Sequence, residues 1–175
     1  MNSSCQSLYS RLYSSLPTST GAHRKILARR VAQDEVNLKK LLPLAGCERG
    51  VASRFLWLLS DVAEINPEKV FEVLPDLFAM REQILHAHLE HSLSKYWSLL
   101  GIPKENEGEA VDLLFQWLVS PNSNVTVKRH SFLALKTLTQ KYPELQSELD
   151  LCVEDQLGKT GKSFDKLINK FSEHS

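Results

Sequence analysis

The chain has 175 residues, of which 42% are hydrophobic and 24% are charged, the balance of a globular domain rather than a disordered chain. No apolar run approaches the roughly 18 residues that a membrane-spanning helix needs. Lys and Arg together number 21, as do Asp and Glu, and the resulting net charge of zero disfavours general binding to nucleic acid or to an anionic membrane.

The first 33 residues are basic. They contain Arg11, Arg24, Lys25, Arg29 and Arg30 and no acidic residue. A basic, Ser-rich start is typical of transit peptides, but the leucines and tyrosines between residues 8 and 16 recur at helical spacing and favour an ordinary amphipathic helix. Arg24, Lys25, Arg29 and Arg30 form a candidate basic patch on the next helix, whose alternative interpretation is a solvated face.

The three cysteines are Cys5, Cys47 and Cys152. An odd number without Cys-x-x-Cys spacing predicts neither a disulfide framework nor a structural zinc site. Free thiols fit a reducing compartment, and we expect the protein in the cytoplasm.

The remaining pattern predicts an all-α protein. Apolar residues recur at three- and four-residue spacing, and turn signals fall at short, regular intervals. About ten helices are expected, of ordinary length for globular proteins. Their predicted ranges are 4–15, 20–32, 34–44, 49–65, 67–82, 85–100, 107–119, 124–141, 143–157 and 161–172.

Three of these helices share an apolar pattern, counted from the evenly spaced residues Val51, Leu89 and Val127. In the first helix the pattern consists of Val51, Phe55, Leu58, Leu59 and Val62. In the third it consists of Val127, Ser131, Ala134, Leu135 and Leu138. A Pro-Glu pair follows both at the same distance. Such self-similarity indicates stacked helix pairs that cover each other's apolar faces.

The segment Val127–Leu138, followed by Pro143-Glu144, resembles the second helix of a HEAT repeat. Pro43 and Pro75 lie inside the preceding predicted helices, as is common in that family, and would kink them. The resemblance implies an α-α superhelix, a HEAT-like solenoid of about five antiparallel pairs over residues 1–175. Within it, residues 1–33 are a divergent basic pair, 34–157 the clearest repeats and 158–175 a capping helix. The alternative is an irregular α-bundle.

Two motifs suggest ligand chemistry, and both have plainer interpretations. His86, His88 and His91 share one predicted helix, but their spacing is not that of a zinc helix, and the nearby Lys95 opposes a metal ion. The segment Gly158–Ser163 resembles the end of a phosphate-binding loop, yet it lacks the first glycine and follows a helix instead of a strand. We therefore expect a surface cluster and a helix–turn–helix linker.

No catalytic constellation is visible. His23 and His130 are single histidines without an acidic partner near them in the sequence. We therefore expect no catalytic residue, metal or cofactor.

Residues on the inner face of the solenoid are the candidate partner-binding site: Trp57, His91, Lys95, Arg129 and Lys136. A tryptophan among basic groups is typical of a binding hot spot. The alternative is that Trp57 packs on a neighbouring repeat while the cations are solvated.

The expected function is that of a non-catalytic scaffold or adaptor that binds a protein partner along this inner face. Some HEAT-like proteins bind DNA and excise alkylated bases. Here the basic N-terminal helix, Arg129 and Lys136 would bind the DNA, and an aromatic residue such as Trp57 would contact the lesion. The zero net charge weighs against that alternative. A weaker resemblance to phycobilin-lyase domains would imply a tetrapyrrole ligand, without any residue specific to it. No membrane partner is expected.

Overall fold

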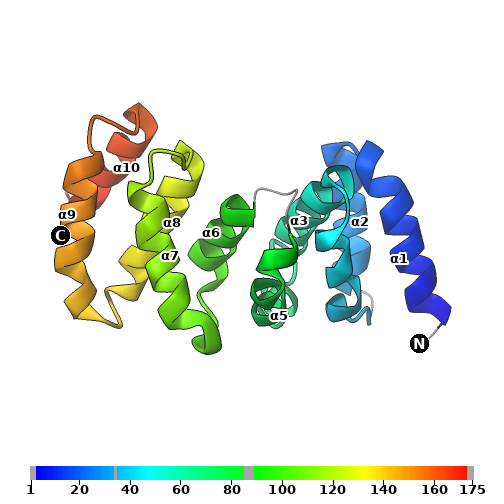
Figure 1. The fold of residues 1–175 in the computed structure, drawn as a ribbon. Helices are drawn as coiled ribbons and strands as arrows, with labels where there is room; N and C mark the ends of the chain where they lie inside the picture. The colour runs from blue at the N-terminus through cyan, green and yellow to red at the C-terminus, as the bar shows by residue number, and fades with distance from the viewer. Residues whose placement is uncertain (1–2, 34, 85–88, 173–175) are drawn as a thin grey trace. The chain divides into compact units, whose positions relative to one another are not determined.

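The computed structural model describes residues 3–33, 35–84 and 89–172, and its regular elements are all helices (Figure 1). The predicted all-α fold is therefore confirmed for this part of the chain. The α-helices are α1 (Ser3–Ser15), α2 (Gly21–Gln33), α3 (Arg49–Ala63), α4 (Pro67–Phe71), α5 (Leu74–Ala79), α6 (Leu89–Leu100), α7 (Glu107–Val119), α8 (Val125–Leu138), α9 (Gln146–Gln156) and α10 (Lys162–Ser172). Among the described residues, no helix has the length and apolar character needed to cross a membrane.

Short 3₁₀ helices join several of these elements. They are η1 (Leu16–Thr18), η2 (Leu38–Gly46), η3 (Arg81–Gln83), η4 (Lys104–Asn106) and η5 (Pro143–Leu145). Among the described residues, three α-helix starts have side-chain caps: the Thr20 side chain accepts the His23 amide at 3.2 Å, the Asn66 side chain accepts the Lys69 amide at 3.2 Å, and the Asn124 side chain accepts the Thr126 amide at 2.9 Å. Each cap satisfies an amide that lacks a partner within its helix.

Two predicted helices are wrong in kind or in length. The segment expected as a helix over 34–44 is the 3₁₀ helix η2, with Pro43 inside it. The helix expected over 67–82 divides into α4, α5 and η3, and α4 ends at Phe71, four residues before Pro75. A proline ring clashes with the carbonyl four residues earlier and supplies no amide hydrogen, so an α-helix cannot continue unchanged through it.

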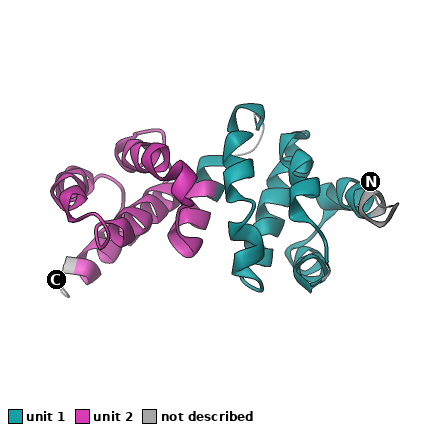
Figure 2. Cartoon of the chain, turned by 90° about the horizontal axis from the view of Figure 1, so that it is seen from below, with its two compact units in different colours: residues 1–92 teal, residues 93–175 magenta. Residues whose placement is uncertain are grey.

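The chain divides into two compact units, residues 1–92 and residues 93–175 (Figure 2). Helix α6 begins at the end of the first unit and continues into the second. Each unit has buried apolar residues of its own. A single solenoid over residues 1–175 stays a prediction.

In the first unit, α3 packs against α2, η2, η1 and α4. Its predicted apolar positions Val51, Phe55, Leu58, Leu59 and Val62 are all 0% exposed. A side chain of α4 also caps the C-terminal end of α2: Lys69 Nζ donates to the Val31 carbonyl at 2.7 Å. Lys69 thereby satisfies a carbonyl that the end of α2 leaves without a helical partner.

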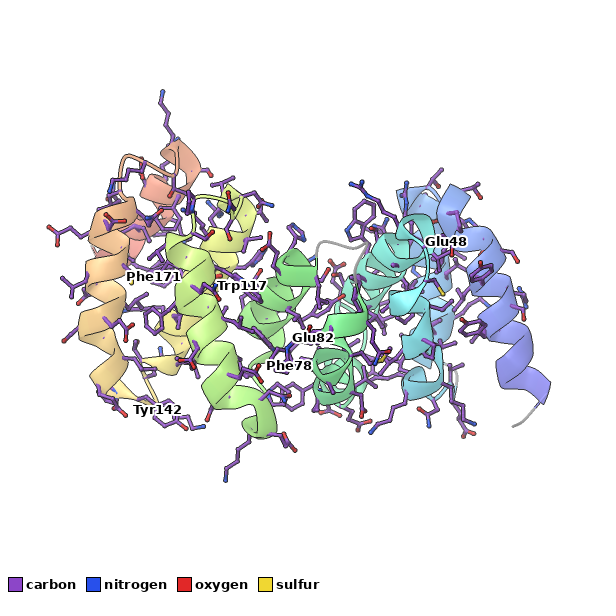
Figure 3. All side chains as sticks on the ribbon, in the orientation of Figure 1. Glu48, Phe78, Glu82, Trp117, Tyr142 and Phe171 are labelled. Carbon is purple, nitrogen blue, oxygen red and sulfur yellow. The ribbon has the colours of Figure 1, made fainter. Side chains whose placement is uncertain are left out.

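In the second unit, α7 and α8 pack together across a short connection. The predicted apolar positions of α8 are buried, as expected from its spacing. Trp117 on α7 (Figure 3) stacks on Trp97 of α6, with ring centroids 5.8 Å apart. Phe132 of α8 meets Phe164 and Phe171 of α10 in edge-to-face contacts, at centroid distances of 6.4 and 5.4 Å.

The turn between α9 and α10 is the predicted helix–turn–helix linker. Gly158 and Gly161 have φ angles of +73° and +120°, values that side-chain-bearing residues rarely adopt. The Gly158 amide donates to the Asp165 carboxylate at 3.2 Å. The positive φ angles explain why glycine occupies these two positions.

Candidate protein-interaction site

Trp57 lies on the exposed side of α3. The apolar positions of α3 point into the first unit, whereas the Trp57 side chain is 42% exposed. Two guanidinium groups lie near its ring: Arg54 Cζ is 5.0 Å from the ring centroid and Arg24 Cζ is 5.5 Å away. Both distances are within the range of a cation–π interaction.

Arg24 reaches Trp57 because a buried carboxylate holds it. Its Nε donates to Asp61 Oδ2 at 2.5 Å, and the two side chains are only 15% and 9% exposed. This ion pair joins α2 to α3 and fixes the guanidinium beside the indole ring. We call Arg24, Arg54, Trp57 and Asp61 the Trp57 cluster.

The Trp57 cluster brings together two predicted surfaces. The sequence placed Trp57 on an inner face and Arg24 in a separate basic patch, yet the two side chains are neighbours. Arg54 is an addition that sequence reasoning missed, although its position three residues before Trp57 is a helical neighbour and could have indicated it. Within the described residues, Arg54 has no hydrogen bond or ion pair, so its donors stay open to a ligand.

The other cations of the predicted basic patch lie elsewhere on α2. Lys25 and Arg29 are exposed, four residues apart on the solvent side. Arg30 lines a groove between α1 and α2. The four cations therefore do not form one face, because a helix of this length turns its side chains through all directions.

The predicted inner-face residues of the second unit are engaged with their own neighbours. Arg129 donates to the Ser163 carbonyl at the start of α10, and Lys136 Nζ donates to Gln146 Oε1 at 3.1 Å. Lys95 is half-buried on α6. An inner face that joins these cations to Trp57 stays a prediction.

The predicted histidine cluster is only partly described. His91 is half-buried in the first turn of α6, while His86 and His88 lie outside the described residues. Among the residues whose positions are given, no group of three His, Cys, Asp or Glu side chains could hold a metal ion. Cys47 and Cys152 are free thiols, and Cys5 lies where the side chains are not described.

His130, which looks isolated in the sequence, has a serine neighbour in the fold. Its Nδ1 lies 2.8 Å from Ser98 Oγ, and that hydroxyl also donates to the Lys95 carbonyl at 2.9 Å. The pair joins α6 to α8.

A buried lysine of the second unit also escaped the sequence analysis. Lys128 is 6% exposed, and its Nζ donates to Gln156 Oε1. Burial lowers the pKa of Lys128, and the nearby Asp155 offsets this only in part. The same Gln156 oxygen accepts the Thr160 hydroxyl at 3.1 Å, so this network ties α8 to the turn after α9.

A second groove lies between α8, α9 and α10, with a volume of about 500 Å³. Its apolar side includes Phe171 (Figure 3) and also Phe132, and its polar side includes Lys136 and Asp150. Charges of both signs line it, so it favours neither an anionic nor a cationic ligand.

Comparison with known proteins gives no match: no protein-family model, curated protein or solved structure corresponds to this chain. The function is therefore argued from the geometry of the chain itself, and the Trp57 cluster is its most distinctive exposed feature.

Proposed function

We propose that the protein is an interaction module, a scaffold or adaptor, that binds a segment of a protein partner at the Trp57 cluster. The observation that carries this proposal is the exposure of Trp57 between two arginine side chains. Tryptophan and arginine are enriched among the residues that contribute most to protein–protein binding.

The cluster is ordered before any partner arrives. Asp61 already holds Arg24 against the ring, so the entropy of ordering that side chain is not lost on binding. Arg54 offers unused donors next to an apolar surface. The cluster therefore suits a segment that carries a carboxylate beside an apolar or aromatic side chain.

We further propose that the helices stack as HEAT-like pairs in a cytoplasmic protein. The burial of the repeated apolar positions of α3 and α8 supports the pairing. The free thiols of Cys47 and Cys152 support a reducing compartment.

The test is an affinity capture from the protein's own cell lysate, with and without nuclease, in which Trp57→Ala is compared with the unmodified chain. Leu151→Ala is the matched control, because Leu151 is 68% exposed on α9. We expect a nuclease-resistant partner whose affinity falls roughly tenfold or more with Trp57→Ala and is unchanged with Leu151→Ala. Equal capture by all three chains contradicts the proposal.

DNA binding, with excision of alkylated bases, is the second candidate. The same exposed indole beside two guanidiniums is a combination that stacks on unpaired bases and contacts phosphate. If this function holds, binding of a labelled oligonucleotide falls steeply as salt is raised and is lost with Trp57→Ala. Absence of salt-sensitive binding removes it.

A further inference from the structure

A groove with a volume of about 450 Å³ runs between α1 and α2 in the first unit. It exists because α1 packs chiefly on η1 and η2 instead of on α2. Two tyrosines hold α1 in that position: Tyr9 Oη lies 3.7 Å from Cys47 Sγ, and Tyr13 Oη donates to Glu48 Oε2 at 3.3 Å.

The groove has an apolar floor. Leu8 and Leu12 contribute from α1, and Leu27 and Val31 from α2. Leu12 and Val31 are 0% and 2% exposed, so the apolar surface that stays open belongs to the half-buried Leu8 and Leu27. Each pair is spaced four residues apart, so each forms a stripe along its own helix. Leu8 and Leu27 leave a narrow apolar strip between the two helices, a surface suited to the apolar face of an amphipathic helix.

The rim of the groove is cationic. Arg11 from α1 and Arg30 from α2 line it together with His23, and none of the Asp or Glu residues that the structure describes does. Within the described part of the chain, neither arginine side chain has an ion-pair or hydrogen-bond partner. Arg24, in contrast, is already neutralised by Asp61. The groove therefore combines an apolar strip with two arginines that have no carboxylate partner among the described residues.

We infer that this groove binds an acidic amphipathic helix of a protein partner. Both α1 and α2 have 13 residues, or about 20 Å of helix, which a partner helix of three to four turns would span. Its apolar residues would rest on the leucine floor and its carboxylates would meet Arg11 and Arg30. This inference goes beyond the Trp57 cluster and does not depend on it, because Arg24 and Arg30 belong to different faces of α2.

The probe is a fluorescently labelled helical peptide of about 14 residues, with leucines at helical spacing and glutamates on its flanks. A matched peptide carries lysine at every glutamate position. Fluorescence anisotropy at physiological ionic strength measures binding of each peptide to the full chain. We expect the glutamate peptide to bind at least about tenfold more tightly than the lysine peptide. Equal affinities overturn the inference.

Charge reversal locates the site. We expect Arg11→Glu with Arg30→Glu to weaken the glutamate peptide at least about tenfold and to strengthen the lysine peptide. Lys25→Glu with Arg29→Glu is the matched control, since it makes the same change in net charge on the solvent side of α2. We expect the control to alter affinity by less than about threefold, because salt screens charges that lie outside the contact.

Two further variants keep the result interpretable. Arg11→Gln with Arg30→Gln removes the charges without reversing them and is used if circular dichroism shows that the reversal disturbs the fold. Trp57→Ala should bind the glutamate peptide as the unmodified chain does, which separates this groove from the Trp57 cluster. An equal loss in the control pair overturns the inference, as does binding to phosphatidylserine vesicles without binding to the peptide.

Discussion

The ion pair between Arg24 and Asp61 gives a direct test of how the Trp57 cluster is built. Arg24→Met removes the guanidinium but keeps most of the aliphatic stem that lies beside Trp57. The Asp61 side chain, 9% exposed, is then left charged, buried and without its ion-pair partner. Both helices that pack at this point, α2 and α3, are affected.

The expected loss is large for a single substitution. Breaking a buried ion pair by removing one partner costs about 3–5 kcal/mol, because the remaining charge has lost both water and partner. Replacing both partners with apolar side chains removes that penalty. We therefore expect Arg24→Met with Asp61→Leu to recover most of the stability.

Urea unfolding followed by far-ultraviolet circular dichroism measures these changes as shifts of the midpoint. Lys25→Met is the control: it removes a positive charge from an exposed position of the same helix and should change stability by less than about 0.5 kcal/mol. If Arg24→Met unfolds at the same urea midpoint as Lys25→Met, the ion pair does not stabilise the first unit. If the double variant is as unstable as Arg24→Met, lost packing and not an unpaired charge explains the effect.

Three other predictions concern the second unit and the backbone. Hydrogen bonds, of which the one from Lys141 has the largest effect, lower the pKa of Glu107, so the ionised carboxylate stabilises the fold above about pH 4.3 and this contribution is lost as the pH falls. The difference in unfolding free energy between the unmodified chain and Glu107→Gln should therefore shrink in acid. A difference that stays constant with pH would contradict the prediction. Phe132→Ala should cost about 3–5 kcal/mol in urea unfolding, because it empties the contact with two aromatic rings of α10. Gly161→Ala should destabilise by more than about 1 kcal/mol because its φ of +120° strains any side chain, whereas Gly21→Ala, with no atom within 4 Å of the added carbon, should be neutral or stabilising by about 0.4–1 kcal/mol.

The sequence by itself determined the helical class, the position of most α-helices and much of the buried surface. Helical spacing was sufficient for the apolar positions of α3, because a side chain's distance along a helix decides which face it occupies. Asn66 followed by Pro67 correctly placed the start of α4. Local sequence failed at η2, where the 3₁₀ geometry around Pro43 differs from the expected α-helix.

The tertiary structure alone decided which charged residues act together. Arg24 and Arg30 look equivalent in the sequence, yet one meets a carboxylate from α3 while the other lines the groove beside α1. Spacing along a chain specifies neighbours within one helix, whereas the partner on another helix depends on how the helices pack. That is why the sequence could nominate Trp57 and Arg24 separately, and why only the fold could show that they form one surface.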